Sequence, residues 1–195
     1  MEKKRKFIAI ACGVLKNELD ELEAKGLVDF PIHYLSSSLH MQPDALREEM
    51  SNLLEREHRP DVRILLIYGD CHAYMEDLAD GRDVVRVRAV NCAEMLLGKE
   101  RYKSLIKEGA FLLLPEWTGR WREILGEFPG LGRDIAADLM HHQHSRLVYL
   151  DTGACPVPYG ELAACSEFVG LPFEVVRVSP DHLTSLIMEA LESDD

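Results

Sequence analysis

Short apolar runs alternate with longer amphipathic stretches along the whole chain, and this alternation restricts the possible folds. The short runs are rich in β-branched and aliphatic residues, as in strands, whereas the stretches between them have helical periodicity. Strands are predicted at residues 7–11, 31–35, 62–68, 84–88, 110–114, 146–150 and 173–178. Helices are predicted at residues 14–25, 44–57, 92–106, 117–127, 131–143, 160–169 and 182–191. Regular strand–helix alternation favours a parallel sheet.

Two of the predicted strands, Ile64–Tyr68 and Phe111–Leu114, are apolar on both faces. Such strands are typical of the centre of a parallel sheet that helices cover on both sides. The run Val84–Arg88 alternates between apolar and charged residues, so we expect it near an edge. We therefore predict a single-domain, three-layer α/β/α fold over residues 1–195, with a mostly parallel, doubly wound sheet. The basic residues 1–6 and the acidic residues 192–195 are expected to be flexible.

Charge and hydropathy exclude several classes of function. The chain carries 34 acidic against 22 basic residues, a formal net charge of −12, which opposes binding to nucleic acid phosphates. No apolar stretch has the length of a signal peptide or of a transmembrane helix. We therefore expect a soluble, cytoplasmic protein without a nucleic acid or membrane partner. In such a protein the five cysteines are expected to be reduced thiols, metal ligands or nucleophiles.

Sulfur and imidazole groups follow four consecutive predicted strands. Cys12 follows the first strand, His40 the second, Cys71 the third and Cys92 the fourth. Because the carboxyl ends of parallel strands form the ligand crevice of an open sheet, these side chains are expected to meet there. Thiolates with an imidazole match the preferences of zinc, and of iron in some sites. The sequence therefore predicts a metal site, with zinc as the first choice.

The number of ligands decides what such a site could do. If His40, Cys71 and Cys92 bind the metal and Cys12 does not, an open position remains for water, a thiol or a carbonyl. If Cys12 also binds, the site is structural or transfers metal. A third interpretation involves no metal: the cysteines are small buried residues and His40 caps the helix near Pro43.

Three acidic residues are candidates for hydrogen bonds to the metal ligands. Glu18 lies on the first predicted helix, Asp70 precedes Cys71, and Glu94 follows Cys92. A metal-bound imidazole usually donates its second N–H to a carboxylate or a carbonyl. The alternative for each is a solvated surface acid, which we favour for Glu94.

Residues after the fifth and sixth predicted strands are expected to form a further wall of the crevice. Trp117 and Arg120 follow the fifth strand, and Asp151 follows the sixth. An aromatic ring beside a fixed cation suits an anionic ligand. Alternatively, one tryptophan of the pair Trp117 and Trp121 packs in the core, and Arg120 only pairs with nearby glutamates.

The assembled motifs resemble an uncharacterised family of anaerobic archaea and bacteria, domain of unknown function 1638. The resemblance runs from about residue 8 to residue 178 and is carried by Ala11–Gly13, Leu39–His40, Tyr68–Cys71, Asn91–Gly98 and Phe111–Trp117. The family implies no established activity. It implies the same metal-type residues, and its members look like neighbours of corrinoid-dependent methyl-transfer systems.

Three hypotheses about function remain open. The first is a zinc-binding protein, either an enzyme or an accessory factor that works with a corrinoid methyltransferase system. The second is a module that binds a small molecule or a partner protein without metal. The third is a thiol-redox or iron–sulfur protein that uses the same cysteines. Whether the protein is an enzyme is left open.

Overall fold

The structure is a computed structural model that describes residues 6–71, 75, 83–126 and 133–193. The chain divides into two compact units, the first made of residues 1–95 with 181–195 and the second of residues 96–180. The C-terminal helix thus belongs with the N-terminal half of the chain.

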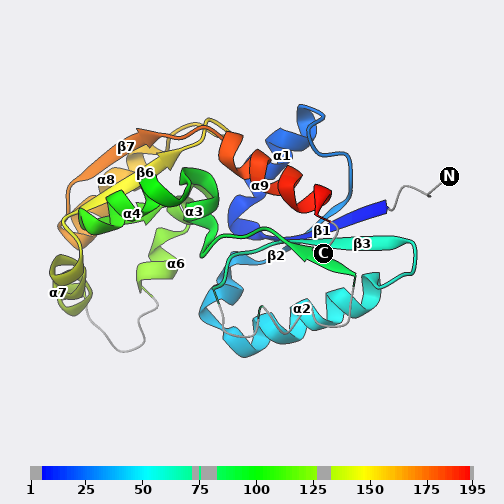
Figure 1. Ribbon diagram of the computed structural model, residues 1–195. Coiled ribbons are helices and arrows are strands. Elements are labelled where there is room, and N and C mark those ends of the chain that lie inside the picture. The colour runs from blue at the N-terminus through cyan, green and yellow to red at the C-terminus, as the bar shows by residue number, and fades with distance from the viewer. Residues whose placement is uncertain (1–5, 72–74, 76–82, 127–132, 194–195) are drawn as a thin grey trace. The chain divides into compact units, whose positions relative to one another are not determined.

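A four-stranded parallel sheet forms the centre of the first unit (Figure 1). Its strands are β1 (Lys6–Cys12), β2 (Ile32–Leu35), β3 (Val62–Ile67) and β4 (Val84–Arg86), in the order β2-β1-β3-β4. After β1 the chain moves outward to β2, and β3 then returns to the other side of β1. The topological switch point therefore lies between the carboxyl ends of β1 and β3, which is where such sheets bind ligands.

Helices cover both faces of this sheet. In Figure 1, α2 lies on one face, and α1 and α9 lie on the other. The helical elements of this unit are η1 (Gly13–Leu15), α1 (Lys16–Ala24), η2 (Ser37–Met41), α2 (Pro43–Glu57) and α9 (Asp181–Glu192), with α3 (Cys92–Leu97) beginning at its end. The β3 residues Val62–Ile67 are all buried, as expected of a strand covered on both sides.

The second unit contains a three-stranded parallel sheet in the order β5-β6-β7. Its strands are β5 (Ala110–Leu113), β6 (Arg146–Asp151) and β7 (Phe173–Arg177). Its helices are α4 (Lys99–Lys107), α5 (Pro115–Gly119), α6 (Trp121–Gly126), α7 (Arg133–Gln143) and α8 (Tyr159–Val169). Tyr149 of β6 and Cys165 of α8 lie in its buried core. Both side chains are fully buried.

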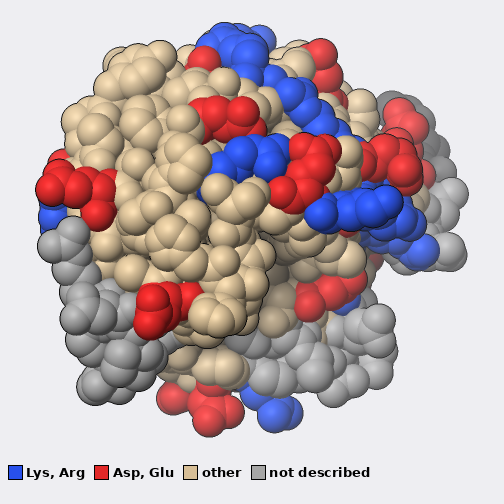
Figure 2. All heavy atoms as spheres, turned by 90° about the vertical axis from the view of Figure 1, so that its left-hand side faces the viewer, with Lys and Arg blue, Asp and Glu red and all other residues tan. Residues whose placement is uncertain are grey.

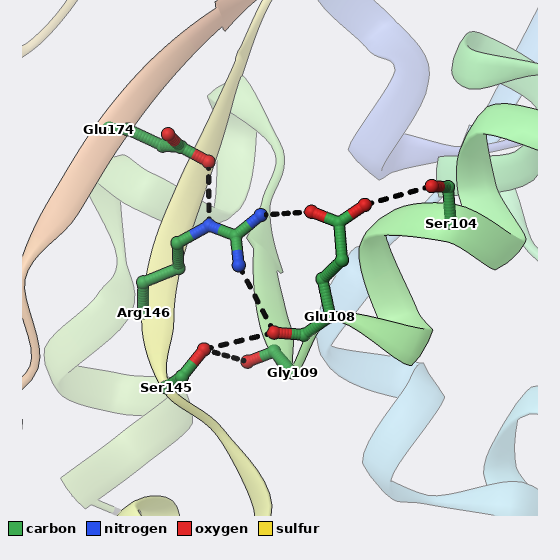
Figure 3. A network of polar contacts seen from close by, with 6 residues as sticks. All are labelled: Ser104, Glu108, Gly109, Ser145, Arg146 and Glu174. Carbon is green, nitrogen blue, oxygen red and sulfur yellow. Dashed lines mark hydrogen bonds and ion pairs between the residues drawn. The ribbon is translucent and has the colours of Figure 1, made fainter.

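Arg146 links three segments at the amino-terminal end of the second sheet (Figure 3). Its guanidinium donates to the Glu174 carboxylate of β7 at 2.7 Å, and to the carboxylate and carbonyl oxygens of Glu108 at 2.8 and 3.1 Å. The Ser145 hydroxyl also donates to the Glu108 carbonyl, at 3.0 Å. These bonds fix where β5, β6 and β7 begin. We assign the network a structural role, because every group in it has a partner.

Acidic and basic side chains are interspersed on the face shown in Figure 2. The second unit pairs many of its arginines locally. Arg122 contacts Glu161 and lies over the ring of Trp121, and Arg177 contacts Asp151 at 2.8 Å. Such pairs cancel charge over short distances, although exposed pairs add little to stability.

The predicted α/β fold with parallel strands is confirmed, and each predicted strand and helix overlaps an observed element. The strands are divided between two sheets, however, and β4 lies at a sheet edge as expected. The long helix predicted at 92–106 is interrupted at Gly98, whose φ of 75° favours glycine. The single-domain expectation stays a prediction.

The predicted flexible ends fall only partly within the described residues. Lys6 is the first residue of β1, and Glu192 is the last residue of α9. Residues 1–5 and 194–195 lie outside the described residues. Within the part of the chain that is described, no helix is long and apolar enough to cross a membrane.

Candidate functional site

Three chain segments meet at the switch point of the first sheet. Cys12 ends β1, and Gly69 and Cys71 follow β3. A Cβ atom at Gly69 would lie 2.4 Å from the Cα of Asn91, so the segment that leads into α3 packs directly on Gly69. The backbone N–H of Asp70 also donates to the carbonyl of Ala89 at 3.1 Å. This packing places the segment of Cys92 against the segment of Cys71.

The Cys12, Cys71 and Cys92 side chains interact with one another, and together we call them the thiol cluster. Cys12 and Cys92 are linked by a side-chain hydrogen bond and are only 8% and 7% exposed, while Cys71 is partly exposed. The backbone N–H of Gly69 lies within hydrogen-bonding reach of the sulfurs of both Cys71 and Cys92. Amide donors of this kind favour the thiolate over the thiol.

Burial and repulsion between neighbouring sulfurs keep the Cys71 and Cys92 thiols protonated. Burial, followed by the repulsion that a Cys12 thiolate and the Asp70 carboxylate would exert on a Cys71 thiolate, raises the pKa of Cys71 to about 11. The hydrogen bond with Cys12 and burial raise the pKa of Cys92 above its usual value. Three neighbouring thiolates are unfavourable without a compensating cation. Cys71 and Cys92 are therefore protonated near pH 7 when no cation is bound.

Tyr68 is a member of the site that sequence reasoning did not assign a role. It is 3% exposed, and its hydroxyl contacts Cys12 but makes no well-aligned hydrogen bond within the described part of the chain. Burial and the nearby cysteines raise the pKa of this hydroxyl, so it remains a neutral donor. The available signal was a tyrosine directly after the apolar run Ile64–Ile67, where a hydroxyl needs a partner.

His40 lies in η2, which directly follows β2. A Cβ atom at Gly13 would lie 2.8 Å from the Leu35 carbonyl oxygen and 3.3 Å from the Ser37 nitrogen. The start of η2 therefore packs beside the residue after Cys12. Among the described residues, no group of three or more His, Cys, Asp or Glu side chains has the geometry of a metal site. Coordination by the cysteines and His40 stays a prediction.

The three candidate acids have different environments. Glu18 and Glu94 are buried, at 1% and 8% exposure, so the interpretation of Glu94 as a surface acid was wrong. Asp70 is exposed and forms an ion pair with Arg86 of β4, with 2.6 Å between Oδ1 and Nη2. Arg86 was not singled out from the sequence, because its partner depends on the pairing of β3 with β4.

Trp117, Arg120 and Asp151 lie in the second unit, each with local partners. The guanidinium of Arg120 pairs with Glu116 and Glu123 at 2.9 and 2.7 Å, the alternative considered from the sequence. Asp151 accepts a hydrogen bond from the Gly153 N–H and pairs with Arg177. Trp121, rather than Trp117, is the buried core tryptophan, at 4% exposure. A role for Trp117, Arg120 and Asp151 in a ligand pocket stays a prediction.

Alkylation of Cys71 should be slow at neutral pH in metal-free protein. Only the thiolate reacts, so the rate should rise about tenfold per pH unit and level off near pH 11. Unfolded protein is the control, because its cysteines should level off near the ordinary pKa of about 8.5. Mass spectrometry of iodoacetamide-treated protein measures both rates. Equal pH profiles for folded and unfolded Cys71 would contradict this expectation.

The same pKa shift predicts how stability depends on pH. The folded protein holds the Cys71 proton more tightly than the unfolded chain does, so this contribution to stability is complete below the unfolded pKa of about 8.5. It is lost as the pH rises toward the folded pKa of about 11. Urea unfolding of metal-free protein at several pH values should show this decrease, and Cys71→Ala should reduce it.

Comparison with known proteins gives one match. The family model of DUF1638, described as a protein of unknown function, matches residues 34–187. No curated protein and no solved structure matches the chain. The matched region includes His40, Cys71 and Cys92, as well as strands of both sheets. The chain therefore belongs to the DUF1638 family.

Proposed function

We propose that the thiol cluster binds a metal ion, with zinc as the first candidate. The single observation that carries this proposal is the mutual contact of Cys12, Cys71 and Cys92 at the switch point of a parallel sheet. These cysteines come from segments far apart in the sequence. Thiolates are the preferred ligands of zinc, and a divalent cation would remove their mutual repulsion.

Metal binding would require a local change in the cluster. The sulfurs must lose their protons and rotate to about 2.3 Å from a shared ion. The Gly69 amide would then donate to the metal-bound thiolates of Cys71 and Cys92. Such hydrogen bonds orient metal ligands and tune the charge on sulfur. His40 is our candidate for the fourth ligand, since η2 begins beside the end of β1.

The number of protein ligands would decide the chemistry. With three cysteines bound, the fourth position could hold water or a substrate thiol, and the ion would act as a Lewis acid. An activated thiol is a methyl acceptor, so this version agrees with the proposed role beside a corrinoid methyltransferase system. With His40 also bound, the site would be closed and structural. A metal-free ligand-binding module and a thiol-redox protein remain the alternatives.

Elemental analysis of tag-free protein tests the proposal. We expect one zinc per chain, and replacement of Cys71 with alanine should weaken zinc binding by more than ~100-fold. Cys155→Ala is the matched control, because Cys155 is also partly exposed but lies after β6 in the second unit. It should retain full zinc content.

Proton release and colour separate the alternatives. Zinc added to metal-free protein near pH 7 should release up to one proton per bound cysteine, because the thiols start protonated. No stoichiometric metal and no proton release would exclude the proposal. A brown protein after anaerobic purification would instead indicate an iron–sulfur cluster.

A further inference from the structure

A groove of about 750 Å³ runs along the outer edge of the first sheet. One wall is β4 with the residues that follow it, from Val84 to Val90, and the other is the C-terminal half of α9, including Leu186 and Ala190. Because β4 is the last strand of the order β2-β1-β3-β4, no further strand among the described residues fills the space. The volume is in the range of small-molecule sites.

Glu94, a largely buried residue, lines this groove. Glu94 is 8% exposed, and no hydrogen bond or ion pair to its carboxylate is found among the described residues. Its backbone N–H donates to the Asn91 side chain at 2.9 Å, which fixes the first turn of α3 and so the position of Glu94. Buried acids are nearly always paired. Within the described residues the carboxylate therefore has no cation or donor beside it, and neither of its oxygens is among the fully buried polar atoms without a partner, so it is open to the groove.

The charges around the groove favour a cationic ligand. Five charged residues line it, and two of them, Asp70 and Arg86, neutralise each other in an ion pair. The other charged residues of the lining are two acids, Glu94 and the exposed Glu189, and one base, Arg88. Their summed charge is negative. The rest of the lining is largely valine, alanine and leucine, which would contact a hydrocarbon chain. A hard metal ion is disfavoured, because it requires six or more oxygen ligands.

We propose that this groove binds a protonated alkylamine, with the ammonium group on the Glu94 carboxylate and the alkyl chain between β4 and α9. The ammonium group would donate charge-assisted hydrogen bonds to the Glu94 carboxylate. Such bonds are stronger than hydrogen bonds between two neutral groups. This inference does not depend on the thiol cluster, since it uses none of the cysteines.

Calorimetric titration of metal-free, full-length protein with n-butylammonium chloride at pH 7 tests this site. We expect saturable binding with a Kd of roughly millimolar order, as suits so small a ligand. n-Butanol has the same chain without the charge, and it should bind about ten- to hundredfold more weakly. Butyrate should not bind. Equal affinity for butylammonium and butanol, or tighter binding of butyrate, would overturn the proposal.

Two substitutions locate the ammonium group. Glu94→Gln should abolish the preference for butylammonium over butanol, and it should not lower the melting temperature, because the carboxylate has no partner among the described residues that the substitution would remove. Glu192→Gln, on α9 but outside the lining, is the matched control and should bind like the wild type. Unchanged amine affinity in folded Glu94→Gln protein would refute the assignment. If the Glu94 variant does not fold, the relative affinities of butylammonium, butanol and butyrate for the wild-type protein still test the proposal.

Discussion

Replacement of Gly69 with alanine should lower the free energy of unfolding by about 3 kcal/mol, the upper part of the range for overpacking. The added Cβ would lie 2.4 Å from the Cα of Asn91, 2.7 Å from its nitrogen and 2.9 Å from the Val90 carbonyl carbon. All three atoms belong to the backbone, so no side chain can rotate away. The segment leading to α3 would have to move off β3. Urea denaturation monitored by circular dichroism measures the change.

The same substitution should weaken metal binding, because it separates the segments of Cys71 and Cys92. Gly160→Ala is the matched control, since nothing lies within 4 Å of its Cβ position in the first turn of α8. That variant should be as stable as the wild type or slightly more stable, because alanine favours a helix. If Gly69→Ala protein kept both wild-type stability and wild-type zinc affinity, the packing of Gly69 on Asn91 would not hold the cluster together.

Replacement of Asp83 with alanine should destabilise the protein by about 3 kcal/mol, because it leaves a buried cation with fewer partners. Arg63 of β3 is 7% exposed, and its Nε lies 2.9 Å from the Asp83 carboxylate just before β4. Its Nη1 donates to the Ser193 carbonyl just after α9. The guanidinium therefore joins the start of β3 to the edge strand and to the C-terminal helix.

The double variant Arg63→Met with Asp83→Ala should be more stable than Asp83→Ala alone by about 1 kcal/mol or more. Methionine fills the space of the arginine stem without a buried charge. Lys25→Ala is the control, since it breaks the exposed helical pair with Glu21 and should cost less than about 0.5 kcal/mol. Equal stability of the single and double variants would show that the charge of Arg63 is solvated after the loss of Asp83.

The secondary structure was largely predictable, because its signals are local. The apolar run Ile64–Tyr68 indicated a covered central strand, and the alternation at Val84–Arg88 indicated an edge strand. Helix interruptions were harder to predict. Gly98 breaks a continuous amphipathic pattern with a positive φ, and Arg120 separates α5 from α6. Hydrophobic periodicity continues across such breaks, so it does not reveal them.

The candidate site was predictable only in part. The positions of Cys12, Cys71 and Cys92 after strands indicated that they would gather, because parallel strands end at a common edge. The burial of Glu94 was missed, since a lone acid in a helix pattern is usually solvated. Tyr68 and Arg86 were missed as well, because their contacts come from other strands.

The sequence by itself determined the order of strands and helices, the parallel α/β class and the strand ends at which the cysteines lie. These features follow from spacing along the chain, which local steric and hydrophobic preferences dictate. Only the tertiary structure decided that the strands divide into sheets of four and three, and that Trp117, Arg120 and Asp151 belong to a different unit from the thiol cluster. Strand partners are chosen by packing between distant segments, such as Gly69 against Asn91, and no local pattern encodes that choice.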